Sequence, residues 1–456
     1  MHLEPPTTST PAPQTGHSLL AAVALAAAII ACSVYANLSL IVTDPAAYRF
    51  FPPFEPGVNA NENQHLGKGT EYANIARSLV NGKGYANPFG RPTGPTAWMP
   101  PILPGFLAGL LWISNGSDAF VFWVIVVVQI IVLTGTGFLV LALIRQTTCR
   151  VAPAAAAAIF VAALLYDFRL AFQWTHDCWL VLVTIDLLIA GACWCGPLRT
   201  WRRAIAWGLL GGFCTLVNPI VGLAWGVLAI AIAIHERTWR RLVVAALVGG
   251  LSLVPWTAWN YWVFGRLIPL KSNLAFELYQ SQCLQPDGLI RRETFSHHLG
   301  NANGREAKEY DAIGEIAYLD RKAERFQQAV RADPADFLDR VAARFMGATL
   351  WYVPFDPPQE ARRPWTLWLS RLTHSLPFLA LMVLVLFGIG DRLHRMHWIV
   401  IGVYLLYLLP YVVVSYYERY AFPLVGVKVV LVILAADRSF AFLMPLVFAK
   451  SREPVM

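Results

Sequence analysis

Charged residues are scarce in this sequence, and its cysteines follow no pattern. Of 456 residues only 14% are charged, whereas a soluble globular protein has about a quarter. The seven cysteines are scattered, without a Cys-x-x-Cys pair or a Cys/His cluster, so neither a zinc site nor a disulfide framework is indicated. A Walker loop, a dinucleotide-binding glycine fingerprint, an HExxH helix and a GxSxG elbow are also missing. This composition excludes a soluble enzyme, a disordered regulator and a small disulfide-rich scaffold.

Apolar runs dominate what is present. Hydrophobic residues make up 57% of the chain, and the mean hydropathy is +0.50. A transmembrane helix needs roughly 20 apolar residues, and the sequence predicts an all-α polytopic membrane protein with about ten such helices. The predicted spans are 18–42, 118–144, 151–168, 177–196, 204–217, 219–234, 242–263, 366–390, 398–415 and 421–436. The fifth and sixth are short and meet at Asn218-Pro219, which predicts a tight hairpin.

The arginines and lysines predict the orientation of the chain. The net charge is +8, but the basic residues lie in short loops between apolar runs rather than on one soluble face, so no nucleic-acid partner is indicated. Basic connections face the cytoplasm, which places both termini inside. The chain then divides into a disordered tail (1–17), a module of about seven spans (18–263), a second outer loop (264–365) and a module of about three spans (366–456). We expect a bacterial inner-membrane protein.

The two predicted outer loops differ in character. The first, 43–117, is rich in Gly, Pro and Asn and contains one clear helix, with Thr70 as a plausible N-cap and Asn81-Gly82 as its end. The second carries equal numbers of acidic and basic residues, which favours a folded, solvated layer. Asp333-Pro334 marks a helix start there. The stripe of Phe337, Val341 and Phe345 should pack this helix against neighbours or the bilayer surface.

The first outer loop also carries a resemblance. Its segment GTEYANIARSLVNGKGYANPFGRPTGPTAWMPP (69–101) resembles the corresponding loop of a bacterial branch of the dolichyl-phosphate-mannose–protein mannosyltransferase-like family, glycosyltransferase family 39. Similar motifs follow in the same order: GLLGGFCTLVNP (208–219), VPWTAWNYWVFG (254–265), Gly314-Glu315 and YERYAFP (417–423). The resemblance implies a GT-C fold. It also implies inverting transfer of a sugar from a polyprenyl-phosphate donor to an acceptor outside the cytoplasm.

Three positions depart from the family pattern. The first loop of the family often has an Asp-Glu pair, and here Thr70 takes the Asp position and leaves Glu71 alone. Trp259 stands where Arg is common, and Lys271 also replaces a common Arg. These departures leave the implied fold intact and concern the handling of the donor or acceptor.

Glu71 is the candidate catalytic residue. Sugar transfer to a hydroxyl requires a carboxylate that takes the acceptor proton and cations that stabilise the departing phosphate. At a helix N-terminus the macrodipole favours the ionised form of Glu71, so it is a modest base that suits late proton transfer. The alternative is that Glu71 only stabilises its helix or pairs with Arg77.

Cations near the outer membrane face are candidates for the donor phosphate. Arg419 presents paired donors suited to phosphate oxygens; alternatively it is an interfacial anchor or pairs with Glu418. Lys428 lies within the last span, where a charge is expensive, and either reaches the same phosphate or pairs with Asp186. Lys271 and Arg77 are weaker phosphate candidates.

Other polar and aromatic residues are candidates for the substrate pocket. They lie at span ends or match motif positions, and the alternatives are interfacial capping, loop ordering and aromatic belting: Asp177, His176, Glu315, Glu277, Asn218, Asn260, Tyr420 and Trp98. Glu62, His65 and Glu71 share one loop, but nothing fixes their geometry, so no metal or other cofactor is assigned. The rival hypotheses are a transporter or flippase, suggested by the buried Asp186 and Lys428, and a non-catalytic relative, suggested by Thr70. Sequence does not identify the sugar, the acceptor or the oligomeric state.

Overall fold

The computed structural model describes residues 16–43, 70–146, 177–355, 357–361, 364–390 and 393–449. These residues form helices joined by turns, and the only β-type pairings among them are two isolated bridges. Seven of the described helical segments are long and apolar enough to cross a membrane. The prediction of an all-α polytopic membrane protein agrees with this architecture.

The seven segments coincide with seven of the predicted spans. They are α4 (Asp118–Gln146), α7 (Cys178–Ala190) with the π-helical turn η2 (Gly191–Cys195), α9 (Pro219–Glu236), α10 (Trp239–Phe264), Leu367–Leu386 across α16 (Pro364–His374) and α17 (Leu376–Gly390), α18 (Arg395–Val414), and Glu418–Leu443 across η4 (Glu418–Leu424) and α19 (Val425–Ala449). The first predicted span is α1 (Gly16–Thr43), whose apolar stretch is Val23–Leu38. The predicted span 204–217 lies in α8 (Trp201–Val217), a helix of 17 residues whose first turn contains two arginines. The predicted span 151–168 lies outside the described residues.

The first predicted outer loop contains one helix more than expected. The expected helix is α2 (Thr70–Val80), which ends at Asn81 and at Gly82 with its positive φ of 71°. A second helix, α3 (Ile102–Ile113), follows the Pro100-Pro101 pair and packs against α2 and α4. Its proline and two glycines are typical of a loop, whereas its buried leucines hold it as a helix.

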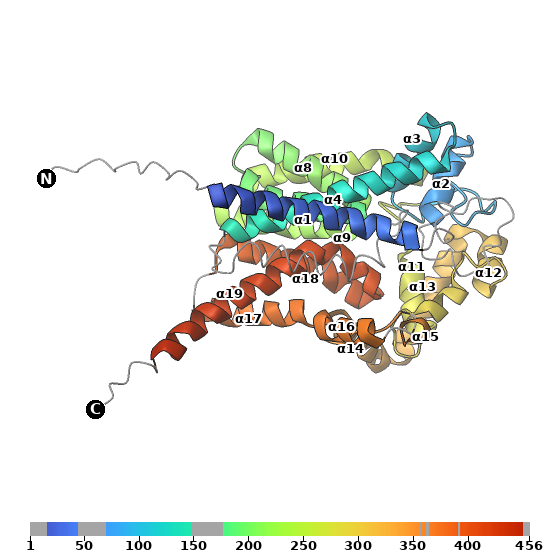
Figure 1. The fold of residues 1–456 in the computed structure, drawn as a ribbon. Helices are drawn as coiled ribbons and strands as arrows, with labels where there is room; N and C mark the ends of the chain where they lie inside the picture. Colours follow the sequence, from blue (N-terminus) through green and yellow to red (C-terminus); the bar gives the residue numbers. More distant parts are fainter. Residues whose placement is uncertain are drawn as a thin grey trace, which may run out of the picture.

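Small residues let the membrane helices approach closely. Helices α8 and α10 lie side by side (Figure 1), and no Cβ fits at Gly208 or Gly212 because α10 atoms occupy that space. Such small-residue contacts drive association where lipid removes the hydrophobic incentive. The predicted hairpin is confirmed: α8 ends at Val217, and Asn218 caps α9 by accepting a hydrogen bond from the backbone N–H of Ile220 (2.9 Å).

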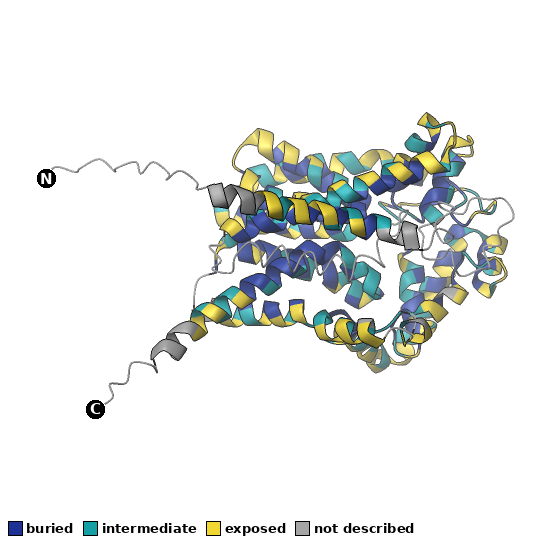
Figure 2. Cartoon of the chain, in the orientation of Figure 1, coloured by how far each residue is buried: buried dark blue, intermediate teal, exposed yellow. Residues whose placement is uncertain are grey.

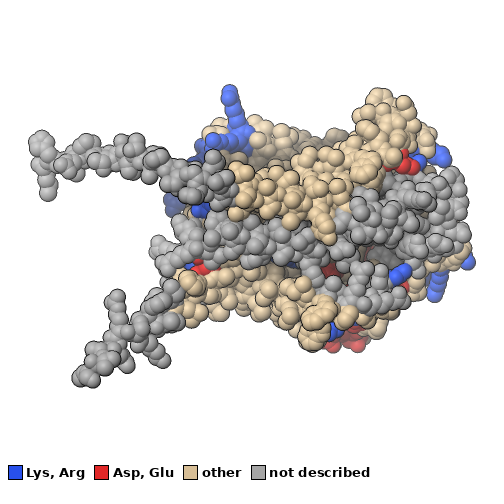
Figure 3. Space-filling model, in the orientation of Figure 1, with Lys and Arg blue, Asp and Glu red and all other residues tan. Residues whose placement is uncertain are grey.

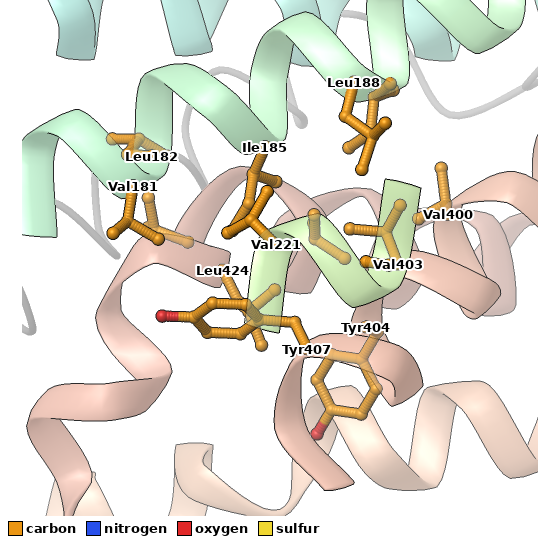
Figure 4. Close-up of a cluster of buried hydrophobic side chains, with 14 of the residues drawn as sticks. Val181, Leu182, Ile185, Leu188, Val221, Val400, Val403, Tyr404, Tyr407 and Leu424 are labelled. Atoms are coloured by element: carbon orange, nitrogen blue, oxygen red, sulfur yellow. The ribbon is translucent and has the colours of Figure 1, made fainter. Parts of the chain in front are cut away.

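The core of the bundle lies where α7, α9, α18 and η4 meet. Figure 4 shows leucine, isoleucine and valine side chains of α7 facing Val221, Val403 and Tyr407. The outward faces of the helices are exposed (Figure 2), and many of the exposed side chains are large and apolar. A bundle with a packed interior and an apolar exterior is what a lipid environment requires.

A layer of shorter, more polar helices covers one end of the bundle. We call it the polar layer. It consists of α2, α11 (Leu274–Cys283), the 3-10 turn η3 (Arg292–His297), α12 (Arg305–Ile313), α13 (Glu315–Ala332), α14 (Pro334–Thr349) and α15 (Pro357–Ala361). It has its own aromatic core, in which Trp98, Phe276 and Tyr318 take part. The first described residue, Gly16, and the last, Ala449, lie at the opposite end (Figure 1).

Two sequence predictions about the polar layer are confirmed. Asp333 caps α14 by accepting a hydrogen bond from the N–H of Asp336 (3.0 Å). The stripe on α14 packs against neighbours, since Phe337 contacts Phe326 and Phe345 contacts Phe378 edge to face. Among the described residues on the face visible in Figure 3, charged side chains gather mostly toward the two ends of the molecule, and the tan surface between them belongs to other residue types.

Candidate functional site

A cavity of about 380 Å³ lies between the bundle and the polar layer. Its walls come from six parts of the chain: the start of α2, the loop before α3, the start of α7, the hairpin between α8 and α9, the segment from Pro269 through α11, and α18 with the turn that follows it. One further wall residue, His298, follows η3. Only the folded chain brings these segments together.

Eight of the residues selected from the sequence line this cavity. They are Glu71, Trp98, Asp177, Asn218, Lys271, Glu277, Arg419 and Tyr420. The cavity is therefore lined by three acidic and two basic side chains at the end of the helix bundle. Apolar side chains such as Val181 and Val414 complete the wall.

Glu71 and His298 lie next to each other inside the cavity. Glu71 Oε1 is 3.5 Å from His298 Nε2, and both side chains are largely buried. The backbone N–H of Gly300 donates to His298 Nδ1 (3.1 Å), so in the neutral ring the proton is on Nε2 and faces Glu71. Burial lowers the pKa of His298 below its usual value, against the opposing effect of Glu71 and Glu277. A neutral imidazole thus presents its N–H to the carboxylate.

Tyr72 joins Asp177 to the same wall. Burial raises the pKa of Tyr72 well above its usual value, and the neighbouring Asp177, to which the hydroxyl donates, raises it further. Tyr72 therefore keeps its proton at any physiological pH. It fixes the Asp177 carboxylate at the start of α7, beside Glu71 on α2.

Arg419 is held by aromatic rings. Its guanidinium carbon is 5.1 Å from the ring centroid of Tyr417 and 5.6 Å from that of Tyr420. Tyr420 in turn stacks on Tyr411 with centroids 4.2 Å apart and planes 15° apart. Cation–π contacts stabilise a guanidinium without neutralising its charge, so Arg419 retains its positive charge beside the cavity.

Lys271 brings the second cation to the cavity wall. Within the described ranges it has no carboxylate within 4.0 Å. Its neighbour Ser272 is tied down on both sides: the Ser272 N–H donates to Ala97 O (2.8 Å) and its hydroxyl to Glu315 Oε1 (2.7 Å). The lysine is therefore placed by the backbone rather than by a partner for its charge.

Glu315 organises the cavity wall from outside the cavity. This buried carboxylate accepts hydrogen bonds from the Thr96 hydroxyl (2.5 Å), the Ala97 N–H (2.8 Å), the Ser272 hydroxyl and the Tyr310 hydroxyl (2.8 Å). Two of the segments that it joins carry Trp98 and Lys271 into the wall. Glu315 is thus a positioning residue, in line with the loop-ordering alternative considered for it.

Four other predicted residues do not line the cavity. Arg77 pairs with Asp118 at the start of α4, not with Glu71. Asn260 is fully buried and donates to Ile268 O (2.8 Å), which closes the turn after α10. Lys428 lies on α19 near His374, and Asp186 accepts from the Thr136 hydroxyl (2.5 Å) instead of pairing with Lys428. His176 lies outside the described residues.

Several cavity residues were not anticipated from the sequence. His298 belongs to a His-His pair with no motif around it, and Asn273 and Gln280 belong to a helix selected only through Glu277. The one available signal was spacing: residues 273, 277 and 280 share a helix face. Of the tyrosines in the wall, only Tyr420 was selected from the sequence.

Metal ligation and similarity to known proteins add no further assignment. Among the described residues no group of three or more His, Cys, Asp or Glu side chains is placed to hold a metal ion, and Glu62 and His65 lie outside those residues. Comparison of the chain with protein-family models, curated proteins and solved structures found no match.

Proposed function

We propose that the protein is an integral-membrane inverting glycosyltransferase of the GT-C type, which moves a sugar from a polyprenyl-phosphate donor to an extracytoplasmic acceptor. The observation that carries the proposal is the convergence of Glu71, Lys271 and Arg419 on one cavity at the end of the membrane bundle. A lipid-linked donor has its hydrocarbon in the bilayer and its phosphate at the interface between bilayer and water. Its reactive carbon therefore lies near that interface, where the end of a membrane bundle also lies.

The reaction requires two chemical roles in the cavity, a base for the acceptor hydroxyl and cations for the departing phosphate. The acceptor hydroxyl oxygen attacks the anomeric carbon, and the bond from that carbon to the phosphate oxygen breaks. The hydroxyl proton passes to Glu71, and the polyprenyl phosphate leaves with the bonding electrons. Arg419 and Lys271 stabilise the charge that develops on the phosphate, because preorganised cations act strongly in a site that excludes water.

His298 prepares Glu71 for this role. The Nε2–H of the imidazole faces the Glu71 carboxylate and orients it within the cavity. Because burial keeps the ring neutral, His298 orients the base without competing with Arg419 and Lys271 for the phosphate. Asp177, held by Tyr72, adds negative charge that suits an oxocarbenium-like transition state.

The test is sugar transfer or release from a panel of radiolabelled polyprenyl-phosphate sugars by the purified protein. We expect the Glu71→Gln variant to lose at least 100-fold in rate, since general-base catalysis contributes typically 10²–10⁴-fold. Glu324→Gln on α13 is the matched control, because Glu324 is an exposed glutamate outside the cavity. Full activity in Glu71→Gln would remove the catalytic assignment.

The two rival functions give different results in the same assay. A wild-type protein that binds the lipid phosphate but releases no sugar with any acceptor would indicate a non-catalytic relative. Movement of the lipid across proteoliposome membranes without cleavage of the sugar would indicate a transporter.

A further inference from the structure

One face of α11 lines the cavity with polar side chains. Asn273 at the N-terminal cap, Glu277 and Gln280 follow one another at intervals of four and three residues, so they share one side of the helix. All three line the cavity. We call them the α11 polar face.

The two amides of this face are buried but incompletely satisfied. Asn273 and Gln280 are each 3% exposed, and Asn273 Oδ1 and Gln280 Oε1 have no hydrogen-bond partner in the described structure. Glu277 between them accepts from the Ser415 hydroxyl (3.0 Å). A buried amide oxygen without a partner costs roughly 1–3 kcal/mol, so two of them beside one cavity indicate groups completed by a ligand.

The chemistry of the α11 polar face selects the ligand. An apolar chain would leave both amides unpaired, and a phosphate would lie against the Glu277 carboxylate. A hydroxyl group both donates and accepts, so it satisfies either end of an amide whichever way the amide is turned. The carboxylates of Glu71 and Glu277 disfavour a ring that itself carries a carboxylate. An uncharged ring with several hydroxyls fits all of these conditions.

We propose that the α11 polar face binds the hydroxyl groups of the transferred sugar and selects a sugar that carries no acidic group. This inference rests on the proposed glycosyltransferase function. The lipid phosphate then lies toward Arg419 and Lys271, and the sugar lies along α11 in the cavity that also contains Glu71.

The position of α11 is fixed on its other sides. Phe276 and Tyr279 are part of the aromatic core of the polar layer, and the Ser281 hydroxyl donates to Val414 O of α18 (2.6 Å). The amides are therefore held in place before a sugar enters, and specificity requires such preorganisation.

The experiment compares binding of two lipids in the absence of an acceptor: a polyprenyl phosphate with a neutral hexose, and the same polyprenyl phosphate without the sugar. For Gln280→Leu, which keeps the volume of the side chain, we expect affinity for the sugar-bearing lipid to fall roughly five- to tenfold. Affinity for the bare lipid phosphate should stay unchanged. Asn273→Leu should behave alike, because the Asn273 side chain makes no capping hydrogen bond.

Gln282→Leu is the matched control. Gln282 is on the same helix, is 4% exposed and also has an Oε1 without a partner in the described structure. It does not line the cavity, and its NH₂ group donates to Asp336 (2.6 Å). It should leave both affinities unchanged. Equal weakening of both lipids by Gln280→Leu, or the same selective loss in Gln282→Leu, would overturn the assignment of α11.

Lipid binding by the wild-type protein distinguishes failure of the sugar subsite from failure of the proposed function. If it binds the sugar-bearing and bare lipids equally well, or binds a uronic-acid lipid as tightly as the neutral one, the sugar subsite is wrong while the phosphate site stands. If it binds neither lipid, the proposed function fails and the subsite with it.

Discussion

Replacement of Glu315 by Gln should loosen the cavity from a position outside it. Two hydrogen bonds converge on each carboxylate oxygen, from Thr96 and Tyr310 on one side and from Ala97 and Ser272 on the other. An amide NH₂ in place of one oxygen removes two acceptor sites. Hydrogen bonds to a charged group contribute about 1.5–3 kcal/mol each, so even with partial rearrangement of the hydroxyls we expect a loss of about 3 kcal/mol.

Thermal unfolding of the detergent-solubilised protein measures this loss. At about 2 °C per kcal/mol, a value appropriate to larger chains, the midpoint should fall by roughly 6 °C. Tyr310→Phe removes only one of the four donors and should cost about half as much. Because Glu315 fixes the segments that carry Trp98 and Lys271, Glu315→Gln should also raise KM for the lipid donor.

Glu324→Gln makes the same chemical change at an exposed position of α13 and should leave the midpoint unchanged. If Glu315→Gln matches this control, the four hydrogen bonds contribute nothing to the stability of the polar layer. If Tyr310→Phe costs as much as Glu315→Gln, the single bond from the Tyr310 hydroxyl accounts for the whole loss, and the other three donors contribute nothing. Either result would refute the reasoning.

Three further predictions follow from single contacts. Because burial lowers the pKa of His298, the folded state binds a proton at this residue less well than the unfolded state does. The wild-type protein should therefore lose stability as the pH falls below about 6.5, and His298→Gln should reduce that loss. Identical profiles of stability against pH for the two proteins would contradict this. Arg419→Lys keeps the charge but loses the planar stacking on Tyr417 and Tyr420, so affinity for bare polyprenyl phosphate should fall about tenfold, and an unchanged affinity would place the phosphate elsewhere. Gly212→Val should push α8 from α10 and lower the unfolding midpoint by several degrees, whereas Gly226→Val, at an open position on α9, should not.

The membrane helices were predictable because lipid leaves few alternatives. Long apolar runs must satisfy their backbone groups internally, and only helices do so within one segment, which is why seven predicted spans coincide with seven helices. The same rule misjudged α3. Its Pro-rich start and its glycines suggested a loop, and only the packing of Leu103 and Leu107 against neighbouring helices makes it a helix.

The residues of the cavity were predictable in part: charged residues could be selected from the sequence, whereas most neutral ones could not. Arg419 and Asp177 stood out because a charged side chain at the end of an apolar span costs free energy, and charged residues in such positions usually have a function. Arg77 and Lys428 were also selected for their charge, but Arg77 pairs with Asp118 and Lys428 lies on α19 near His374, so neither lines the cavity. The sequence alone does not show these positions.

His298 and Gln280 illustrate the opposite case. Neither residue lies in or next to an apolar run. Both belong to a polar segment, where histidine and glutamine are common. Packing within the polar layer places His298 against Glu71, and docking of this layer onto the bundle turns one face of α11 into the cavity. Charged residues next to apolar spans can thus be recognised in the sequence. Neutral polar residues become notable only when folding buries them, and the sequence does not show that burial. On this reasoning, the charged residues that line such a cavity can be selected before the fold is known, whereas its neutral polar residues are found only from the fold.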